Sequence, residues 1–338
     1  MPYGAQLDYG DTWAGRYALE NIKLQTVNFN PSISYKLDDH QSFGFGLSAQ
    51  YMKANLQKAV DVKSGFSAAA LAAEEGGNFG LAAQYAGLAG ATTGDGSAAL
   101  SADGWGYGFN LGYMFQLDEH TRFGLAYRSK IKQTLKGTST WDYSNAGPAQ
   151  VQAAANSVHA TSSAQTTVDT PQSASANFYH DLNDKLAVMG NVTWTGHSAM
   201  NGIDISFSQP GEGDMLIKQN WKNSWLFALG ANYKYSDSLM LRTGVAYDQS
   251  PVPSDQLRDP ALPDSDRYWL SLGANYKFTK QSSVDLAYSY VFFKNASVNY
   301  TDVCAGQLAC SYTGNGETTN GSYKTHLQLV GVQYNYAF

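Results

Sequence analysis

Strict alternation of apolar residues with small or polar residues constrains the fold of this chain more than any other feature. Between Trp105 and Leu117 every odd position is apolar, and the even positions hold mostly Gly, Asn and Gln. The same pattern recurs in further segments, namely 43–51, 123–127, 225–235, 268–278, 286–292 and 330–338. Successive side chains of a β-strand point to opposite faces, so a period of two indicates strands with one apolar face. The sequence therefore predicts an all-β, antiparallel fold with about eleven strands.

The composition excludes several other protein classes. Charged residues make up 15% of the 338 residues and aromatic residues 13%, with 23 Tyr and 33 Gly, whereas soluble domains usually carry about 25% charged residues. No apolar run reaches the roughly 18 residues that indicate a transmembrane helix, and the mean hydropathy is −0.34. The net charge of −6 argues against a nucleic-acid partner. A membrane β-barrel stays compatible, because its lipid-facing and lumen-facing residues cancel in a hydropathy average.

Short polar turns alternate with long insertions between the predicted strands. The turns fall at 38–41, 118–121, 183–184, 236–238 and 279–281, and the insertions near 59–103, 138–165, 209–213, 252–265 and 300–322. Outer-membrane barrels have short periplasmic turns and longer extracellular loops. We therefore predict a single antiparallel transmembrane β-barrel domain over residues 1–338, located in the outer membrane of a Gram-negative cell.

The segment 59–103, predicted to be an extracellular loop, differs from the rest in composition. Residues 68–73 are Ala except for Leu71, and Glu74 and Glu75 follow. Ala is the strongest helix former. We expect a short helix folded over the outer mouth of the barrel, and a flexible loop is the alternative.

The last nine residues form a strand with an apolar face. That face carries Val330, Val332, Tyr334, Tyr336 and Phe338. This ending resembles the C-terminal sorting strand of bacterial outer-membrane barrels, whose final Phe is read by the barrel assembly machinery. The resemblance implies the lipid bilayer and that machinery as partners, and it puts Phe338 at the periplasmic end with the short turns.

The two cysteines, Cys304 and Cys310, lie close together in a segment rich in Gly, Thr and Asn. A small disulfide exposed to an oxidising compartment is one interpretation, and two free thiols are the other. No His stands beside them, so we expect no metal site.

Several stretches spread over nearly the whole chain resemble one known family. They are 13–17, 30–36, 104–110, 127–130, 242–252 and 262–269. The most specific is the run Tyr-Asp-x-Ser-Pro-Val from Tyr247, followed by Pro-Asp-x-Asp-Arg from Pro263. These stretches resemble the FadL-type outer-membrane transporters of long-chain fatty acids and aromatic hydrocarbons. The resemblance implies passive transport of hydrophobic compounds, most of all long-chain fatty acids, by a barrel that has ligand-binding sites and needs no cofactor.

The family pattern also bears on where the chain begins. Family members have fourteen strands and an N-terminal hatch with an Asn-Pro-Ala motif, whereas Tyr3-Gly4 here resembles the end of the third strand. No signal peptide opens the sequence at Met1. An open edge strand in lipid would leave backbone groups unpaired, at several kcal/mol each. We therefore expect an N-terminally truncated barrel with about eleven of the fourteen family strands.

Two lysines are candidate ligands for a fatty-acid head group. A carboxylate that leaves water needs a cation to replace its hydration, and its tail needs an apolar groove. Lys58 has lumen parity near the outer end of a predicted strand, and it matches a basic head-group position of the family. Lys218 is a weaker match, because the second lysine of the relatives aligns with Ile217, and a shift of one residue reverses the face. The alternative for both lysines is an ordinary barrel charge or a side chain that reaches the interface.

A set of charged residues is predicted to form a network inside the barrel. Its members are Arg128, Lys130, Arg242, Asp248, Asp264, Asp266 and Arg267. Charges are tolerated in a buried lumen when they pair. We expect Arg242 to pair with Asp248, or Arg267 to pair with Asp264 and Asp266, and we favour structural pairing over direct contact with substrate.

Alternative functions remain open from the sequence. A general diffusion porin would need a wide polar lumen, and an adhesin or receptor would work through its long loops. An enzyme is disfavoured, because no Gly-x-Ser-x-Gly elbow occurs and His40, His120 and His180 stand beside the short turns. We therefore predict no catalytic residues.

Overall fold

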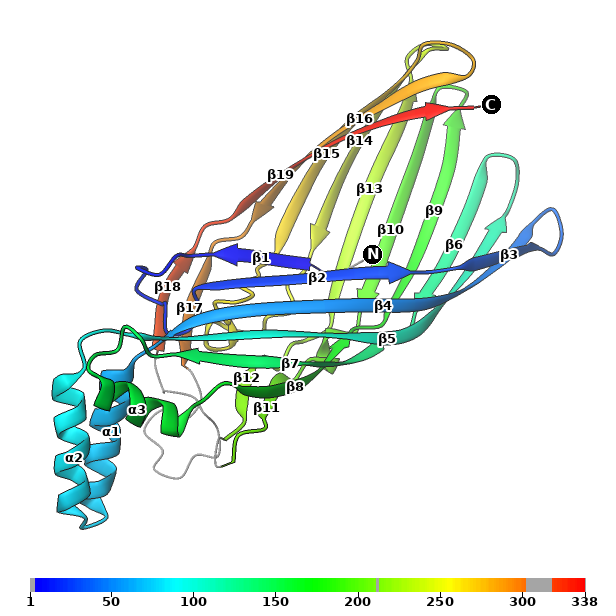
Figure 1. Ribbon diagram of the computed structural model, residues 1–338. Coiled ribbons are helices and arrows are strands. Elements are labelled where there is room, and N and C mark those ends of the chain that lie inside the picture. The colour runs from blue at the N-terminus through cyan, green and yellow to red at the C-terminus, as the bar shows by residue number, and fades with distance from the viewer. Residues whose placement is uncertain (1–3, 211–212, 302–317, 338) are drawn as a thin grey trace.

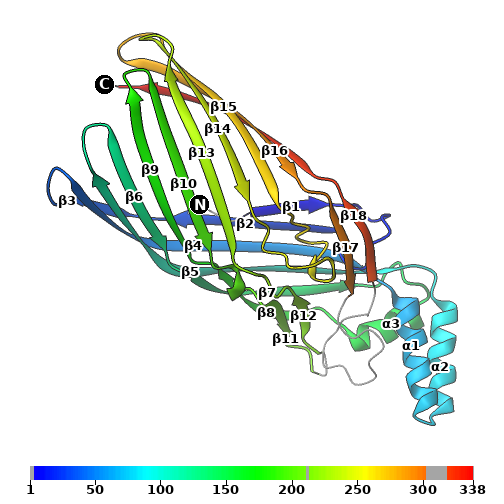
Figure 2. The same ribbon diagram turned by 180° about the vertical axis from the view of Figure 1, so that it is seen from behind.

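The computed structural model describes residues 4–210, 213–301 and 318–337. One curved wall of antiparallel strands dominates the structure, and three helices gather at one of its ends (Figures 1 and 2). The prediction of an antiparallel all-β fold is confirmed. Cys304 and Cys310, which carry the disulfide hypothesis, lie outside the described residues.

Eleven strands cross the wall in the described part of the chain, if β2 and β3 count as one strand. In order they are β2 (Asn21–Phe29) with β3 (Ser32–Lys36), β4 (Gln41–Val60), β5 (Gly96–Gln116), β6 (Thr121–Arg128), β9 (Ser173–Asn183), β10 (Leu186–Thr195), β13 (Ser224–Lys234), β14 (Leu239–Asp248), β15 (Arg267–Lys277), β16 (Ser282–Phe293) and β19 (His326–Tyr336). Pro31, which has no N–H to donate, separates β2 from β3. The short β1 (Gly4–Asp8) pairs with the first residues of β2.

Five short turns join strands at one end of the wall, which we call the short-turn end. In each turn one side-chain oxygen accepts the backbone N–H groups two and three residues later. The acceptors are Asp38, Asp118, Asn183, Ser236 and Thr279. Such side-chain bonds favour tight turns over a continued strand. All five turns coincide with the predicted ones, and Figure 1 shows them opposite the helices.

The outer face of the wall is apolar and exposed. Trp105 is 56% exposed and Phe227 45% exposed, although both are large and hydrophobic. Cross-strand pairs continue this face around the wall, as in Tyr51 with Trp105 and Tyr247 with Tyr268, whose ring centroids lie 5.4 and 5.2 Å apart. An exposed band of this kind is expected where hydrocarbon replaces water as the solvent. The predicted division into an apolar outer face and a smaller, more polar inner face is confirmed.

At the other end, which we call the long-loop end, four further strands extend the same sheet beyond the wall. They are β7 (Ile131–Asp142), β8 (Ser162–Thr170), β11 (Gly202–Phe207) and β12 (Met215–Lys218), and β7 pairs with the first residues of β5. A separate hairpin of β17 (Ala296–Thr301) and β18 (Thr318–Tyr323) lies at the same end. Two short 3₁₀ turns, η1 (His197–Ala199) and η2 (Asp255–Leu257), complete the elements.

The loop between β4 and β5 holds two helices, where we expected one short helix. They are α1 (Val62–Glu75) and α2 (Phe79–Ala91), and α3 (Ala149–Val158) follows β7. Asp61 and Asn78 cap α1 and α2 by accepting the N–H groups of Ser64 and Leu81. Gly77, with a φ of +74°, lets the chain reverse between the two helices. Within the described residues, no helix has the length and apolar character needed to cross a membrane.

Candidate ligand-binding site

Lys58 lies near the end of β4, next to the helices of the long-loop end. The β4–β5 register is continuous from Gln41 to Val60, so Lys58 shares the inner face with Gln50 and Met52. It stands opposite Ala98 of β5, which stands opposite Trp141 of β7. Lys58 is only 9% exposed. The fold therefore places this cation inside the protein, with a small residue between it and the indole of Trp141.

Two aromatic groups accompany Lys58. The imidazole of His159 stacks on Trp141, with ring centroids 4.6 Å apart and an interplanar angle of 17°. Burial lowers the pKa of His159, and the nearby positive charge of Lys58 lowers it further. The indole N–H of Trp141 is buried, and no described residue accepts its hydrogen bond. The three side chains thus offer positive charge and an unused donor in one place.

No carboxylate among the described residues lies within ion-pair distance of Lys58. A buried cation without a counterion is costly, so this position favours an anionic ligand. The neighbouring cluster is apolar: Val62, Phe66, Ala89, Tyr143, Val151 and Ala155 form its centre, and Val60 and Trp141 pack against it. A cation at the border of an apolar cluster suits a ligand with an anionic head and an apolar tail.

Close packing of β7 on β5 holds this arrangement. A Cβ added at Gly104 would meet the backbone of Thr134, so only glycine lets β7 pass so near. Next to this contact, Gln133 and Gln50 are fully buried, and the Gln50 amide donates to Gln133 Oε1 over 2.9 Å. Gln133 in turn donates to the carbonyl of Gln50 over 3.0 Å. These bonds fix β7, the strand that carries Trp141.

Lys218 has a different setting from Lys58. It is the last residue of β12 and its side chain is exposed, whereas Ile217 is buried opposite Ile203 of β11. Neighbouring residues of a strand face opposite ways, so the face that carries Ile217 is closed to Lys218.

The predicted charge network exists in part. Arg267 bonds Asp248 Oδ2 from Nε over 2.8 Å, and it also pairs with Asp264 over 2.5 Å. No ion pair between Asp266 and Arg267 occurs among the described residues. The Asp266 carboxylate instead accepts the N–H of Ser250 (2.9 Å) and the hydroxyl of Tyr247 (3.2 Å). Burial raises the pKa of Asp264, and Arg267 opposes that rise.

The expected pair of Arg242 with Asp248 is wrong. These residues stand six positions apart on one strand, about 20 Å along its axis. Arg242 instead pairs with Asp285 over 2.7 Å. It stands opposite Gly273 in the register, and since glycine has no side chain, the guanidinium can cross β15 to reach β16.

Of the other predicted network members, Lys130 pairs with Asp169 of β8 over 2.8 Å. Arg128 stands opposite Asn110 of β5. No ion pair among the described residues includes Arg128.

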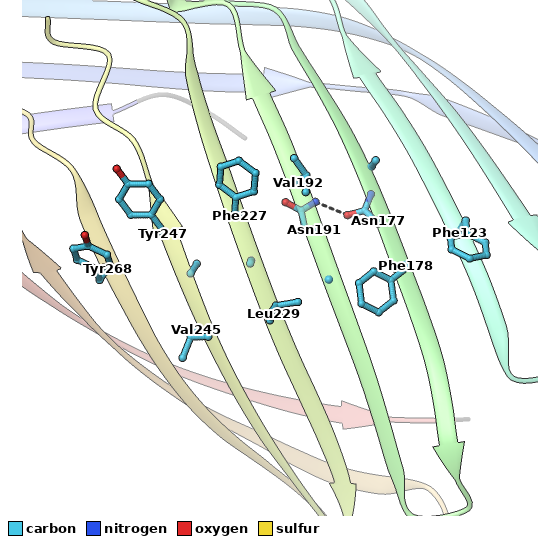
Figure 3. A pocket seen from close by; sticks show the side chains of 14 residues that line it. Phe123, Asn177, Phe178, Asn191, Val192, Phe227, Leu229, Val245, Tyr247 and Tyr268 are labelled. Atoms are coloured by element: carbon cyan, nitrogen blue, oxygen red, sulfur yellow. Dashed lines mark hydrogen bonds between the residues drawn. The ribbon is translucent and has the colours of Figure 1, made fainter.

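Two apolar hollows lie on the outer face of the wall rather than inside it. One, of about 670 Å³, runs across β6, β9, β10, β13, β14 and β15 (Figure 3). Its lining includes the exposed side chains of Phe123, Phe178, Phe227, Leu229 and Tyr268. The second, of about 680 Å³, lies over β3 to β6 and the start of β9. Both face the side where the alternation puts hydrocarbon, so they are suited to acyl chains of the bilayer.

The sequence pattern singled out Lys58 as a candidate and did not single out Trp141 or His159. Trp141 becomes a neighbour only through the β4–β5–β7 register, and His159 follows α3 in a loop whose path no local pattern fixes. The alternation around 131–141 is a signal that could have placed Trp141 on the inner face.

These observations define a transmembrane β-barrel with a lipid-facing aromatic exterior. A comparison with protein families matches residues 1–338 to the family described as outer membrane protein transport protein (OMPP1/FadL/TodX). The long-chain fatty acid transport protein of Escherichia coli (strain K12) is 31% identical over 350 residues, covering 99% of this chain and 72% of that protein. An outer-membrane protein of Neisseria meningitidis serogroup B is 32% identical over 253 residues, covering 72% of this chain and 53% of that protein. The chain thus spans about half the length of the second relative.

Solved structures agree on the fold. A FadL homologue from Pseudomonas aeruginosa superposes with a TM-score of 0.80 at 24% identity, covering 99% of this chain and 73% of that one. The toluene transporter TodX of Pseudomonas putida gives a TM-score of 0.64 at 19% identity, covering 99% and 76%. The chain belongs to the OMPP1/FadL/TodX family of outer-membrane transport proteins. Its location is therefore the outer membrane, and the prediction of a transport protein rather than an enzyme is confirmed by the family.

Proposed function

We propose that this protein passes hydrophobic compounds across the outer membrane, and that long-chain fatty acids are its preferred substrates. Lys58 carries the proposal: it is buried, has no carboxylate partner among the described residues, and borders an apolar cluster. The fatty-acid carboxylate binds the Lys58 ammonium and the Trp141 N–H, and the tail packs toward the cluster. The similarity to the long-chain fatty acid transport protein of Escherichia coli supports this substrate class.

In this proposal, Lys218 binds the fatty-acid carboxylate at a second position, which is exposed. Its side chain is accessible, and its loss is expected to affect binding less than the loss of Lys58. The charge network of Arg267, Asp248 and Asp264 supports the barrel and does not touch the ligand.

Binding of fluorescent oleate to the purified protein tests the role of Lys58. Charge-assisted hydrogen bonds contribute about 1.5–3 kcal/mol, so Lys58→Ala should weaken binding about 10- to 100-fold. Lys53→Ala is the matched control, since Lys53 is an exposed lysine on the opposite face of the same strand. Lys58→Arg should keep most of the affinity. Oleyl alcohol, which lacks the charge, should bind wild type and Lys58→Ala alike.

The other substrate and function classes predict different results. A channel for aromatic hydrocarbons, like the toluene transporter TodX, would bind toluene and show no dependence of oleate binding on Lys58. A general porin would let small sugars swell liposomes. An adhesin or receptor would neither bind toluene nor let small sugars swell liposomes. Equal oleate affinity of wild type and Lys58→Ala removes the head-group proposal.

We also propose that the barrel assembly machinery recognises the C-terminal strand. The support is the sequence of residues 330–338, whose apolar face ends on Phe338. Deletion of Phe338 should lower the amount of folded protein in the outer membrane, measured by gel mobility of unheated samples. Unchanged amounts would contradict this proposal.

A further inference from the structure

A polar cavity of about 280 Å³ lies at the long-loop end of the barrel, apart from Lys58. We infer that this end is extracellular, because outer-membrane barrels carry their longer loops on the outside. We call it the rim cavity. It is lined by residues near the start of β13, by the loop that contains η2, and by the segment between β16 and β17. Three cations, Lys222, Arg258 and Lys294, belong to its lining.

None of these three cations forms an ion pair with a described carboxylate. Arg258 donates from Nε to the Asp264 carbonyl over 3.0 Å and from another nitrogen to the Ser297 carbonyl, and both acceptors are neutral. Lys222 and Lys294 are exposed at the surface.

The lining also contains two carboxylates, Asp255 and Asp266. Asp266 already accepts the Ser250 N–H and the Tyr247 hydroxyl, and Asp255 accepts the N–H of Gln256 over 3.1 Å. Three cations against two carboxylates leave the cavity with an excess of positive charge. The lysine ammonium groups of the cavity are therefore available to a ligand, whereas the Asp266 carboxylate is engaged by Tyr247 and Ser250.

The rim cavity lies directly above an aromatic band on the outer face. The registers align Phe227, Tyr247, Tyr268 and Phe292 across four strands. Figure 3 shows the hydroxyl groups of Tyr247 and Tyr268 directed toward the long-loop end. Tyr and Trp girdles mark the membrane–water interface of barrels. Because the Tyr247 hydroxyl reaches Asp266 of the rim cavity, the cavity stands at the level of the lipid head groups.

The same two tyrosines line the 670 Å³ hollow below the rim cavity. One hydrogen bond links the two hollows: Tyr247, which lines the outer hollow, donates its hydroxyl to Asp266, which lines the rim cavity. This combination fits one molecule with a phosphate at its head and an acyl chain at its tail. Guanidinium and ammonium groups bind phosphate oxygens through charge-assisted bonds, and the outer hollow removes the acyl chain from contact with other lipids.

We propose that the rim cavity and the outer hollow together bind a phosphorylated lipid of the outer leaflet. Lys222, Arg258 and Lys294 hold the phosphate, and Phe227, Val245 and Tyr268 contact the acyl chain. This site faces the bilayer and does not depend on the proposed substrate.

Native mass spectrometry of the purified protein with bisphosphorylated lipid A tests the proposal. Wild type should retain this lipid, and Lys222→Ala/Lys294→Ala should retain it at least about tenfold less. Lys185→Ala/Lys280→Ala, which changes two lysines at the short-turn end, is the matched control and should bind as wild type does. Ala176→Trp, which fills the hollow, should also weaken binding while leaving every cation in place.

Three further measurements decide between lipid and other ligands. Dephosphorylated lipid A should bind wild type and the Lys222→Ala/Lys294→Ala variant equally and weakly. Full displacement of the lipid by millimolar inorganic phosphate would show a site for free phosphate and would overturn the proposal. Equal retention by wild type and the double variant would overturn it as well. Oleate binding, measured on the same samples, should stay unchanged. An unchanged affinity for oleate shows that the variants are folded.

Discussion

Because β7 packs closely on β5, we expect that one methyl group added at Gly104 lowers the stability of the protein strongly. In Gly104→Ala the new Cβ would come well under 3.0 Å from Thr134 O and to 3.0 Å from the Thr134 carbonyl carbon. The obstacle is backbone, so the strand must move by several tenths of an ångström. That movement disturbs Leu135, which is buried against Met52 and Ala102. Overpacking of this kind costs about 1–3 kcal/mol.

The displaced strand also carries Trp141 away from Lys58, so oleate binding should weaken together with stability. Gly112→Ala is the matched control, because Gly112 lies on the same strand and the same face and has no atom within 4 Å of an added Cβ. Urea unfolding followed by tryptophan fluorescence measures stability, and fluorescent oleate measures binding. Equal unfolding midpoints for the two variants would refute the idea that glycine is required for the crossing.

Two further predictions concern buried polar groups. Gln133→Leu should cost about 1–3 kcal/mol in urea unfolding, because the Gln50 amide stays buried without its acceptor; the double variant Gln50→Leu/Gln133→Leu should recover part of that loss, and no recovery would argue against the paired amides. Burial, aided by Arg267, lowers the pKa of His197 from 6.5 to about 4. The folded state therefore favours neutral imidazole, so the stability of the η1 loop should be full above pH 6.5 and fall as the pH drops toward 4. Hydrogen exchange at 197–202 measures this, and His197→Gln, which keeps a partner for the Ser224 hydroxyl, should abolish the dependence.

The wall of the barrel was predictable because its determinants are local. Alternation fixes which residues face lipid, as Trp105 and Phe227 show, and one oxygen such as that of Asp118 fixes each short turn. Parity also placed Lys58 on the inner face.

Features that depend on register were not predictable from parity. Parity puts Arg242 and Asp248 on one face but says nothing of their separation, and only the register shows that Arg242 crosses Gly273 to Asp285. Likewise, the sequence pattern predicts only that Gly104 is a small residue on the lumen face. The neighbouring sequence does not indicate that β7 packs against it. Trp141 and His159 join Lys58 through such long-range packing.

The position of a bound fatty acid tests the central claim most directly. A crystal structure with a brominated long-chain fatty acid would locate the tail by anomalous scattering and the carboxylate by density. We predict the carboxylate within about 3 Å of Lys58 Nζ, with the bromine among the side chains of the apolar cluster that contains Val62, Phe66 and Val151. A fatty acid found only in the outer hollows, with no density beside Lys58, would contradict it.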